Sequence, residues 1–233
     1  MDGPGKNSLG TEMMDRLLAR IAEAKGEPIL LTGAGDAFSA GLNLKEVVSL
    51  EGAAMETFLR KLDTVMATLF MHPAPTVALV NGHAIAGGCI MAAACDYRVL
   101  VEGTSRMGVP ELAVGVPFPT LPFEIVRARV PPAAFRDLVF SGRMVLPQEA
   151  VALGLADEIA PHDVLLARAQ QAADRLAAIP AVTFALTKRT FAEPLLARIR
   201  AAAPLNDEVV AAWADEGVQQ HVRAYLEKAL RKA

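Results

Sequence analysis

The chain has 233 residues, 53% of them hydrophobic, and a formal net charge of −3 at pH 7, which fits one large domain with a substantial core. It lacks the basic excess or Lys/Arg stripe typical of nucleic-acid binding, so no nucleic-acid partner is expected. No apolar run reaches membrane-spanning length and the first residues lack the apolar core of a secretion signal, so we expect a cytoplasmic protein without a membrane partner.

The first half of the chain shows strands and helices in alternation. Apolar residues at helical spacing predict a helix over 11–21, with Thr11 as its N-cap. The wholly apolar run 28–32 predicts a buried parallel strand, closed by the glycine-rich loop 33–41. A clear amphipathic pattern then predicts a helix over 55–69.

The second half continues this pattern and then becomes helical. Strands are expected at 76–80 and 96–101, and the small-residue run 89–95 between them suits a buried helix. This alternation implies right-handed βαβ crossovers and a mostly parallel sheet. After residue 118 the pattern is almost wholly helical, apart from a strand-like piece at 156–160. The apolar stripe of 207–230 needs a partner, either the body of the domain or another subunit.

No metal site is expected from the ligand residues. The two cysteines, Cys89 and Cys95, are too few for a thiolate site, and the four histidines show no ligand spacing. On one helix the two thiols would lie about 240° apart in rotation, so they could not pair with each other. Small buried thiols in an apolar run favour a reducing compartment.

The segment from Val80 to Ile90 carries the strongest functional signal. A strand that passes through the Gly87-Gly88 pair into a helix leaves backbone N–H groups unpaired at the helix N-terminus. Such donors suit a developing negative oxygen. Glu111, the one acid in its loop, follows twenty-one residues after Ile90. An anion hole and a carboxylate suit proton transfer beside a carbonyl, although a tight turn with a surface glutamate would give the same pattern.

The glycine-rich run 33–41 invites two other interpretations. It fails as a dinucleotide-binding fingerprint because Phe38 stands at the third glycine position. It is similar to the Gly-Ala-Gly-Asp-x-Phe run of ribokinase-like sugar kinases. In those kinases the run comes late in a longer chain, after the sugar-binding sheet, whereas here nothing that could bind a sugar precedes residue 33. We therefore do not expect a sugar kinase.

Three other polar residues are expected to have structural roles. Asp96 is expected to bond backbone groups at a helix–strand junction, and Glu124 to be a surface or helix-cap acid. His83, beside the glycine turn, is more typical of a structural residue but could line a pocket.

The glycine segments, their order and the acid that follows them resemble the crotonase superfamily of enoyl-CoA hydratases and isomerases. The segments that carry the resemblance are Asn7-Ser8-Leu9, Gly35 through Leu44, Asn81-Gly82 through Gly87-Gly88-Cys89, Cys95-Asp96-Tyr97-Arg98, Pro110-Glu111 with Gly115, and Ser141-Gly142-Arg143. The combination is specific where each piece alone is weak.

This resemblance implies an α/β fold, a crotonase-like spiral of ββα units with a C-terminal helical trimerisation region. It divides the chain into a spiral core at 1–180 and a helical region at 181–233, and it implies a homotrimer or hexamer. The family's β-hairpin before the Asn-x-Leu segment is missing from this sequence, so the start is expected to be trimmed or the first turn incomplete.

The resemblance also assigns the site. The backbone N–H groups of Leu42 and Gly87 would form an oxyanion hole for the thioester oxygen of an acyl-CoA, and Glu111 would be the catalytic acid–base. The substrate- and CoA-binding residues implied are Ala40, Leu42, Asn43, Leu44, His83, Gly87, Ile90, Pro110 and Glu111. No separate cofactor is expected, because coenzyme A enters as the substrate thioester.

One position departs from the hydratase pattern. Hydratases of this family carry two glutamates, and the first of these positions is Ile90 here. Because Ile90 can neither activate water nor place a proton, we do not expect efficient hydration. One carboxylate suffices to move a proton from C2 to C4 of a 3-enoyl thioester. An apolar wall that includes Ile90 should raise the pKa of Glu111.

Several further segments look like the mitochondrial delta-3,delta-2-enoyl-CoA isomerases, among them Gly115-Val116-Pro117-Phe118 and Ala178-Ile179-Pro180. The resemblance therefore predicts a fatty-acyl-CoA double-bond isomerase with Glu111 as proton shuttle. Two alternatives remain: a hydratase or another crotonase-type enolate reaction, and a non-catalytic acyl-CoA-binding subunit.

Overall fold

Two four-stranded sheets form the centre of the protein, whose computed structural model describes residues 1–231. The first sheet is parallel throughout, in the order β1 (Ile29–Thr32), β3 (Thr76–Val80), β5 (Tyr97–Val101) and β8 (Glu158–Ala160). The second has the order β2 (Ala37–Ser39), β4 (His83–Ile85), β6 (Met107–Gly108) and β7 (Met144–Val145), with β6 and β7 antiparallel. From β1 to β6 the strands alternate between the two sheets along the chain, so each passage is a ββα unit, as expected.

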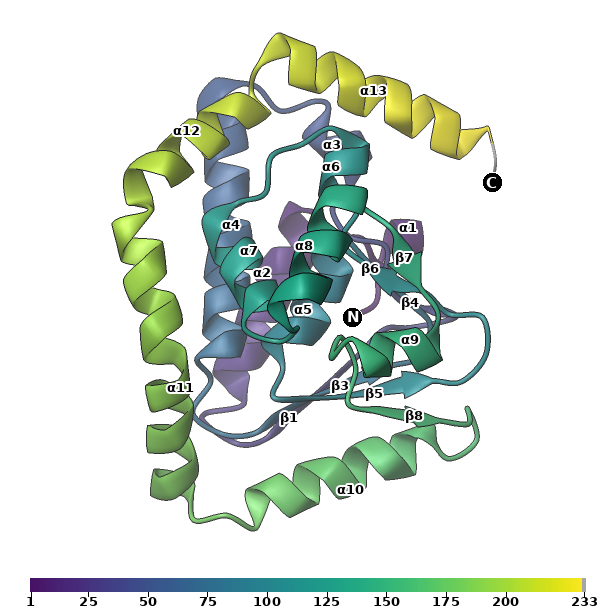
Figure 1. Cartoon of the computed structure of the whole chain (residues 1–233), viewed down its shortest axis with the longest axis vertical. Helices are drawn as coiled ribbons and strands as arrows, with labels where there is room; N and C mark the ends of the chain where they lie inside the picture. Colours follow the sequence, from purple (N-terminus) through teal and green to yellow (C-terminus); the bar gives the residue numbers. More distant parts are fainter. Residues whose placement is uncertain (232–233) are drawn as a thin grey trace.

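Helices cover the sheets and form the whole C-terminal part (Figure 1). Their bounds are α1 (Pro4–Asn7), α2 (Thr11–Glu23), α3 (Leu44–Val47), α4 (Gly52–Phe70), α5 (Gly87–Ala94), α6 (Glu111–Val114), α7 (Thr120–Arg127), α8 (Pro132–Ser141), α9 (Pro147–Ala152), α10 (Leu165–Ala177), α11 (Ala181–Ala201), α12 (Ala203–Trp213) and α13 (Glu216–Leu230). No helix among residues 1–231 is long and apolar enough to cross a membrane.

Helix α5 lies at the centre, and every one of its residues is buried. Its sequence of small residues lets α4 and α7 pack closely on it. Gly88, in its first turn, lies directly against the backbone of Ser39 on β2, where an added Cβ would clash with the Ser39 carbonyl oxygen. The glycine pair is therefore needed to bring this helix N-terminus against the second sheet.

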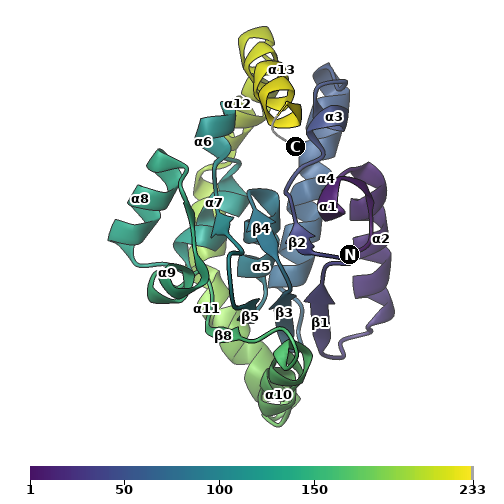
Figure 2. The same cartoon turned by 90° about the vertical axis from the view of Figure 1, so that its right-hand side faces the viewer.

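The C-terminal helices wrap the core (Figures 1 and 2). Helix α10 packs on the first sheet, α11 runs along one flank, α12 packs on α4, and α13 packs on α3 and α6. A buried ion pair of 2.8 Å between Lys188 and Asp96 ties α11 to the start of β5. Asp96 also accepts a hydrogen bond from the backbone N–H of Thr76 (2.9 Å), which confirms its expected junction role. The last residues of the expected helical region, 232–233, lie outside the described residues.

The predicted long elements are present, with differences at short ones. Helix α2 begins at Thr11 and Gly10 is its N-cap, so the predicted cap is one residue too late. The expected helical segment 207–230 is divided by a turn into α12 and α13. The expected loop 33–41 contains β2, and Glu111 is the first residue of α6 rather than a loop residue. The prediction that Glu124 is a surface or helix-cap acid is wrong, because its side chain is 4% exposed and pairs with Arg198 and Arg127.

Candidate active site

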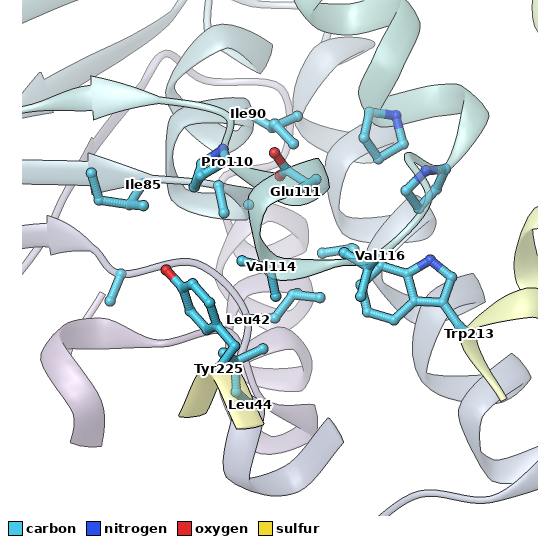
Figure 3. Close-up of a pocket in the computed structure, with 16 residues that line it drawn as sticks. Leu42, Leu44, Ile85, Ile90, Pro110, Glu111, Val114, Val116, Trp213 and Tyr225 are labelled. Carbon is cyan, nitrogen blue, oxygen red and sulfur yellow. The ribbon is translucent and has the colours of Figure 1, made fainter. Parts of the chain in front are cut away.

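A pocket lies where the N-termini of α5 and α6, the β2–α3 loop and the C-terminal helices meet (Figure 3). It is lined by Ala40, Leu42, Leu44, Leu62, Ile85, Ala86, Gly87, Ile90, Pro110, Glu111, Val114, Val116, Pro119, Pro122, Trp213 and Tyr225. Most of these side chains are apolar, and Glu111 is the one carboxylate among them. The pocket therefore suits an uncharged, largely apolar group placed against a single acid.

The two glycine segments of the sequence touch at one edge of this pocket. Gly41 has a φ of +89°, and an added Cβ there would lie 2.8 Å from the carbonyl oxygen of Ile85 and 2.9 Å from the Cβ of Ala86. Only glycine allows this conformation together with so close an approach. The contact sets Leu42 beside Gly87, where a Cβ added at Gly87 would lie 3.6 Å from the Leu42 side chain.

The backbone N–H of Leu42 is left free by the local pairing. Leu42 forms an isolated parallel bridge with Leu9, in which the N–H of Leu9 donates to Gly41 (2.7 Å) and the N–H of Asn43 donates to Leu9 (3.1 Å). Both bonds use the neighbours of Leu42, so its own N–H points away from Leu9. Within residues 1–231 this N–H has no hydrogen-bond acceptor.

The N–H of Gly87 is free for a different reason. Gly87 is the first residue of α5, and the first N–H groups of a helix have no acceptor within the helix. The preceding residue, Ala86, has φ +50° and ψ −126°, a conformation that a residue with a Cβ rarely adopts. Strained residues of this kind gather at functional sites. The structure thus holds two backbone donors without a described acceptor on residues that line the same pocket.

Glu111 is buried among apolar groups. Its side chain is 6% exposed, and its Oε2 has no hydrogen-bond partner within the described part of the chain. Burial raises the pKa of the carboxyl to about 8, against a small lowering by its own backbone N–H. Figure 3 shows Ile90 beside this carboxylate. The sequence expectation of a raised pKa in an apolar wall therefore agrees with the structure, and such a group can take up and release a proton near neutral pH.

Not all the expected binding residues reach the pocket. Ala40, Leu44 and Pro110 line it, together with Leu42, Gly87, Ile90 and Glu111. Asn43 does not, because it is the N-cap of α3. His83 does not either, since it lies on β4 and its Nδ1 accepts a hydrogen bond from the backbone N–H of Arg106 (3.2 Å). Asn43 and His83 therefore lie outside this pocket, and their predicted contact with the CoA part of the substrate stays a prediction.

Nine of the sixteen lining residues escaped the sequence prediction, and two of these come from the last two helices. Trp213 comes from α12 and Tyr225 from α13, the helices that pass over the site. Both belong to the apolar stripe of 207–230, for which the sequence analysis expected a packing partner. For these two residues that partner is the wall of the pocket. The position of this stripe over the glycine segments is tertiary information that the pattern alone does not carry.

The site contains no metal-binding group of the usual kind. Among the described residues, no three His, Cys, Asp or Glu side chains gather closely enough to hold a metal ion.

The family model of the enoyl-CoA hydratase/isomerase family matches residues 1–232, almost the whole chain. The chain belongs to this family. A putative enoyl-CoA hydratase of Thermus thermophilus is 35% identical over 244 aligned positions, which cover 97% of this chain and 92% of the relative. The fold agrees as well: the probable enoyl-CoA hydratase EchA3 of Mycobacterium tuberculosis has a TM-score of 0.83 at 30% identity, covering 91% of this chain and 90% of the other.

A further structure shares the fold at lower identity. Human mitochondrial delta3-delta2-enoyl-CoA isomerase has a TM-score of 0.93 at 24% identity, covering 99% of this chain and 92% of the other. These findings establish a crotonase-fold enzyme of the enoyl-CoA hydratase/isomerase family, whose members use CoA thioesters without a separate cofactor. Names of relatives include both hydratases and isomerases, so the reaction itself has to be argued from the site.

Proposed function

We propose that this enoyl-CoA hydratase/isomerase family member is an isomerase that converts 3-enoyl-CoA to 2-enoyl-CoA. The observation that carries the proposal is Glu111, a single buried carboxylate with a raised pKa, in one pocket with Leu42 and Gly87, whose backbone N–H groups have no described acceptor. A base near neutral pH and two donors for a developing oxyanion are what an enolate reaction needs.

Hydration is disfavoured by the absence of a second acid in the described pocket lining. Adding water to a double bond needs one group to activate water and another to place a proton. Ile90 stands where the second glutamate of a hydratase would be, and it lines the pocket. Another acid near Glu111 in sequence, Glu124, is paired with Arg198 and Arg127 and does not line this pocket.

In the proposed mechanism the thioester oxygen accepts hydrogen bonds from the N–H groups of Leu42 and Gly87. Glu111 removes a proton from C2, and the electron pair of the broken C–H bond moves into a dienolate whose negative oxygen the two donors stabilise. Glu111 then returns the proton to C4, so that the double bond moves from C3–C4 to C2–C3. The carboxylate is regenerated, and nothing is gained or lost from the substrate.

The test is the product formed from a trans-3-enoyl-CoA, with a 2-enoyl-CoA in a parallel assay. An isomerase produces the ultraviolet absorbance of a conjugated thioester from the first substrate with no change in mass. A gain of one water from the second substrate would instead indicate a hydratase. If neither substrate changes, the isomerase assignment fails and a non-catalytic binding subunit or another thioester reaction takes its place.

The pH dependence of the reaction should follow the carboxyl of Glu111. Proton abstraction requires its ionised form, and the pKa of Glu111 is raised to about 8. The kcat/KM for a 3-enoyl-CoA should therefore rise about tenfold per pH unit below that pKa and level off above it. Initial rates from about pH 6 to about pH 10, with circular dichroism to confirm folding, measure this profile. A rate that is level from pH 6 upwards would contradict Glu111 as a buried base.

We also propose that the protein self-associates, with a homotrimer or hexamer as the expected assembly. The support is a set of exposed apolar side chains on α11, including Val182, which is 72% exposed, and Leu186 one turn later. Exposed apolar residues along one helix are typical of an interface. Light scattering on a sizing column would give the mass, and a monomer at micromolar concentration would contradict the proposal.

A further inference from the structure

The pocket has an exposed end and a buried end. Ala40, Leu42, Leu44, Ile85 and Tyr225 are exposed or half-buried, whereas Leu62, Val116, Pro119, Pro122 and Trp213 are buried. In Figure 3 Tyr225 lies to the lower left of Glu111, and Val116 with Trp213 lies to its lower right. A polar CoA moiety must leave through the exposed end, so an acyl chain attached to it would extend past Glu111 toward Trp213.

One hydrogen bond holds the indole of Trp213, and a second holds its backbone. Its side chain is 2% exposed, and its Nε1–H donates to the carbonyl oxygen of Pro117 (2.9 Å). Its own carbonyl oxygen accepts a hydrogen bond from the side-chain amide of Gln219 (2.7 Å). The indole is thus fixed to the loop before α7, while the backbone of Trp213 is tied to α13, and the ring cannot swing aside without breaking its hydrogen bond to Pro117.

We propose that Trp213 is a specificity-determining residue that closes the buried end of the pocket and sets the longest acyl chain the enzyme accepts. This inference rests on the proposed function only in taking an acyl-CoA as the ligand, and it does not depend on the isomerisation step. Binding of unreactive ligands therefore tests it separately.

The test is the affinity for saturated acyl-CoAs from butyryl to palmitoyl, measured by calorimetry. In the wild type, affinity should rise with chain length and then stop rising or fall once the chain meets the indole. In Trp213→Leu and Trp213→Phe the rise should continue to longer chains, by about fourfold for each further buried methylene. The same maximum in wild type and in both variants would overturn the proposal.

A control variant separates this effect from general loss of packing. Val210 is buried on the same helix, three residues before Trp213, and does not line the pocket. Val210→Ala should lower the melting temperature and leave the preferred chain length unchanged. A shift in Val210→Ala as large as in Trp213→Leu would assign the effect to the helix as a whole and overturn the role of the indole.

The wild-type protein offers a measurement that needs no variant. Trp213 is the only tryptophan in the sequence, so intrinsic indole emission reports on this position alone. Emission should change on binding those acyl-CoAs that reach the indole, and not on binding butyryl-CoA. Emission that is unaffected by every chain length would overturn the proposal. If emission and binding behave as proposed while no 3-enoyl-CoA is isomerised, the proposed function fails and the role of Trp213 stands.

Discussion

Replacing Glu111 with glutamine is expected to lower the isomerase turnover number by about 10²–10⁴-fold while acyl-CoA affinity changes little. Glutamine keeps the size and shape of the side chain but cannot accept the C2 proton. Glu111 is the one carboxylate lining the pocket among the described residues, so no neighbour there can replace it. The affinity is maintained because the apolar wall and the two backbone donors do not change.

The measurement combines the 3-enoyl-CoA assay with calorimetry of a saturated acyl-CoA. Glu102→Gln is a suitable control, because Glu102 is an exposed acid that does not line the pocket and its loss should change neither quantity. Full turnover in Glu111→Gln would transfer the base role to another group. A fall in affinity equal to the fall in turnover would make Glu111 a binding residue rather than the base.

The pH dependence of the free energy of unfolding of Glu111→Gln distinguishes the loss of a catalytic base from a general loss of folding. Because the pKa of Glu111 is about 8 in the folded protein and 4.5 is its ordinary value, the folded state binds more protons than the unfolded state between these pH values. Wild-type stability should therefore fall as pH rises from 4.5 to 8, by on the order of 5 kcal/mol. Glutamine has no carboxyl group to titrate, so the stability of the variant lacks this fall. The free energy of unfolding of the variant minus that of the wild type should therefore increase from pH 4.5 to pH 8. Denaturant titrations at several pH values measure it.

The sequence predicted the catalytic residues of the site better than the apolar residues that line its pocket. Leu42, Gly87 and Glu111 stand in local segments whose glycines dictate the backbone, and the structure brings all three to one pocket. Trp213 and Tyr225 arrive from helices about a hundred residues after Glu111, and their placement depends on how α12 packs on α4 and how α13 packs on α3 and α6. No local pattern encodes that packing.

The misses in the fold have a similar origin. Strands β2 and β4 have three residues each and lie in or beside glycine turns, which is too short for a period of two to be visible. Their position is fixed by pairing with each other across the sheet. Glu124 has the sequence context of a surface acid, and only the approach of Arg198 from α11 explains its burial. Asp96, whose place at a helix–strand junction can be read from the local pattern, was predicted correctly, and it accepts a hydrogen bond from the backbone N–H of Thr76.

Gly41→Ala should lower turnover by about 10²–10³-fold, the cost of losing one oxyanion donor. An alanine at φ +89° is strained, and its Cβ would lie 2.8 Å from the Ile85 carbonyl oxygen and 2.9 Å from the Ala86 Cβ. A backbone oxygen and a Cβ atom cannot rotate out of the way. The clash is therefore relieved only if the two glycine segments separate. Separation moves the N–H of Leu42 away from that of Gly87, and the dienolate oxygen can then be held by one donor only.

Gly35→Ala is the matched control for Gly41→Ala. Gly35 stands in the same glycine-rich segment 33–41, before β2, with φ +73°, and nothing lies within 4 Å of an added Cβ. Both variants carry backbone strain, which should lower the free energy of unfolding by about 1–3 kcal/mol each. Both should therefore melt at a lower temperature than the wild type. Only Gly41→Ala should lose turnover on a 3-enoyl-CoA, measured well below both melting temperatures. Equal loss in both variants would attribute the effect to strain in the loop, and wild-type turnover in Gly41→Ala would show that the close approach of the two segments is not what holds the oxyanion.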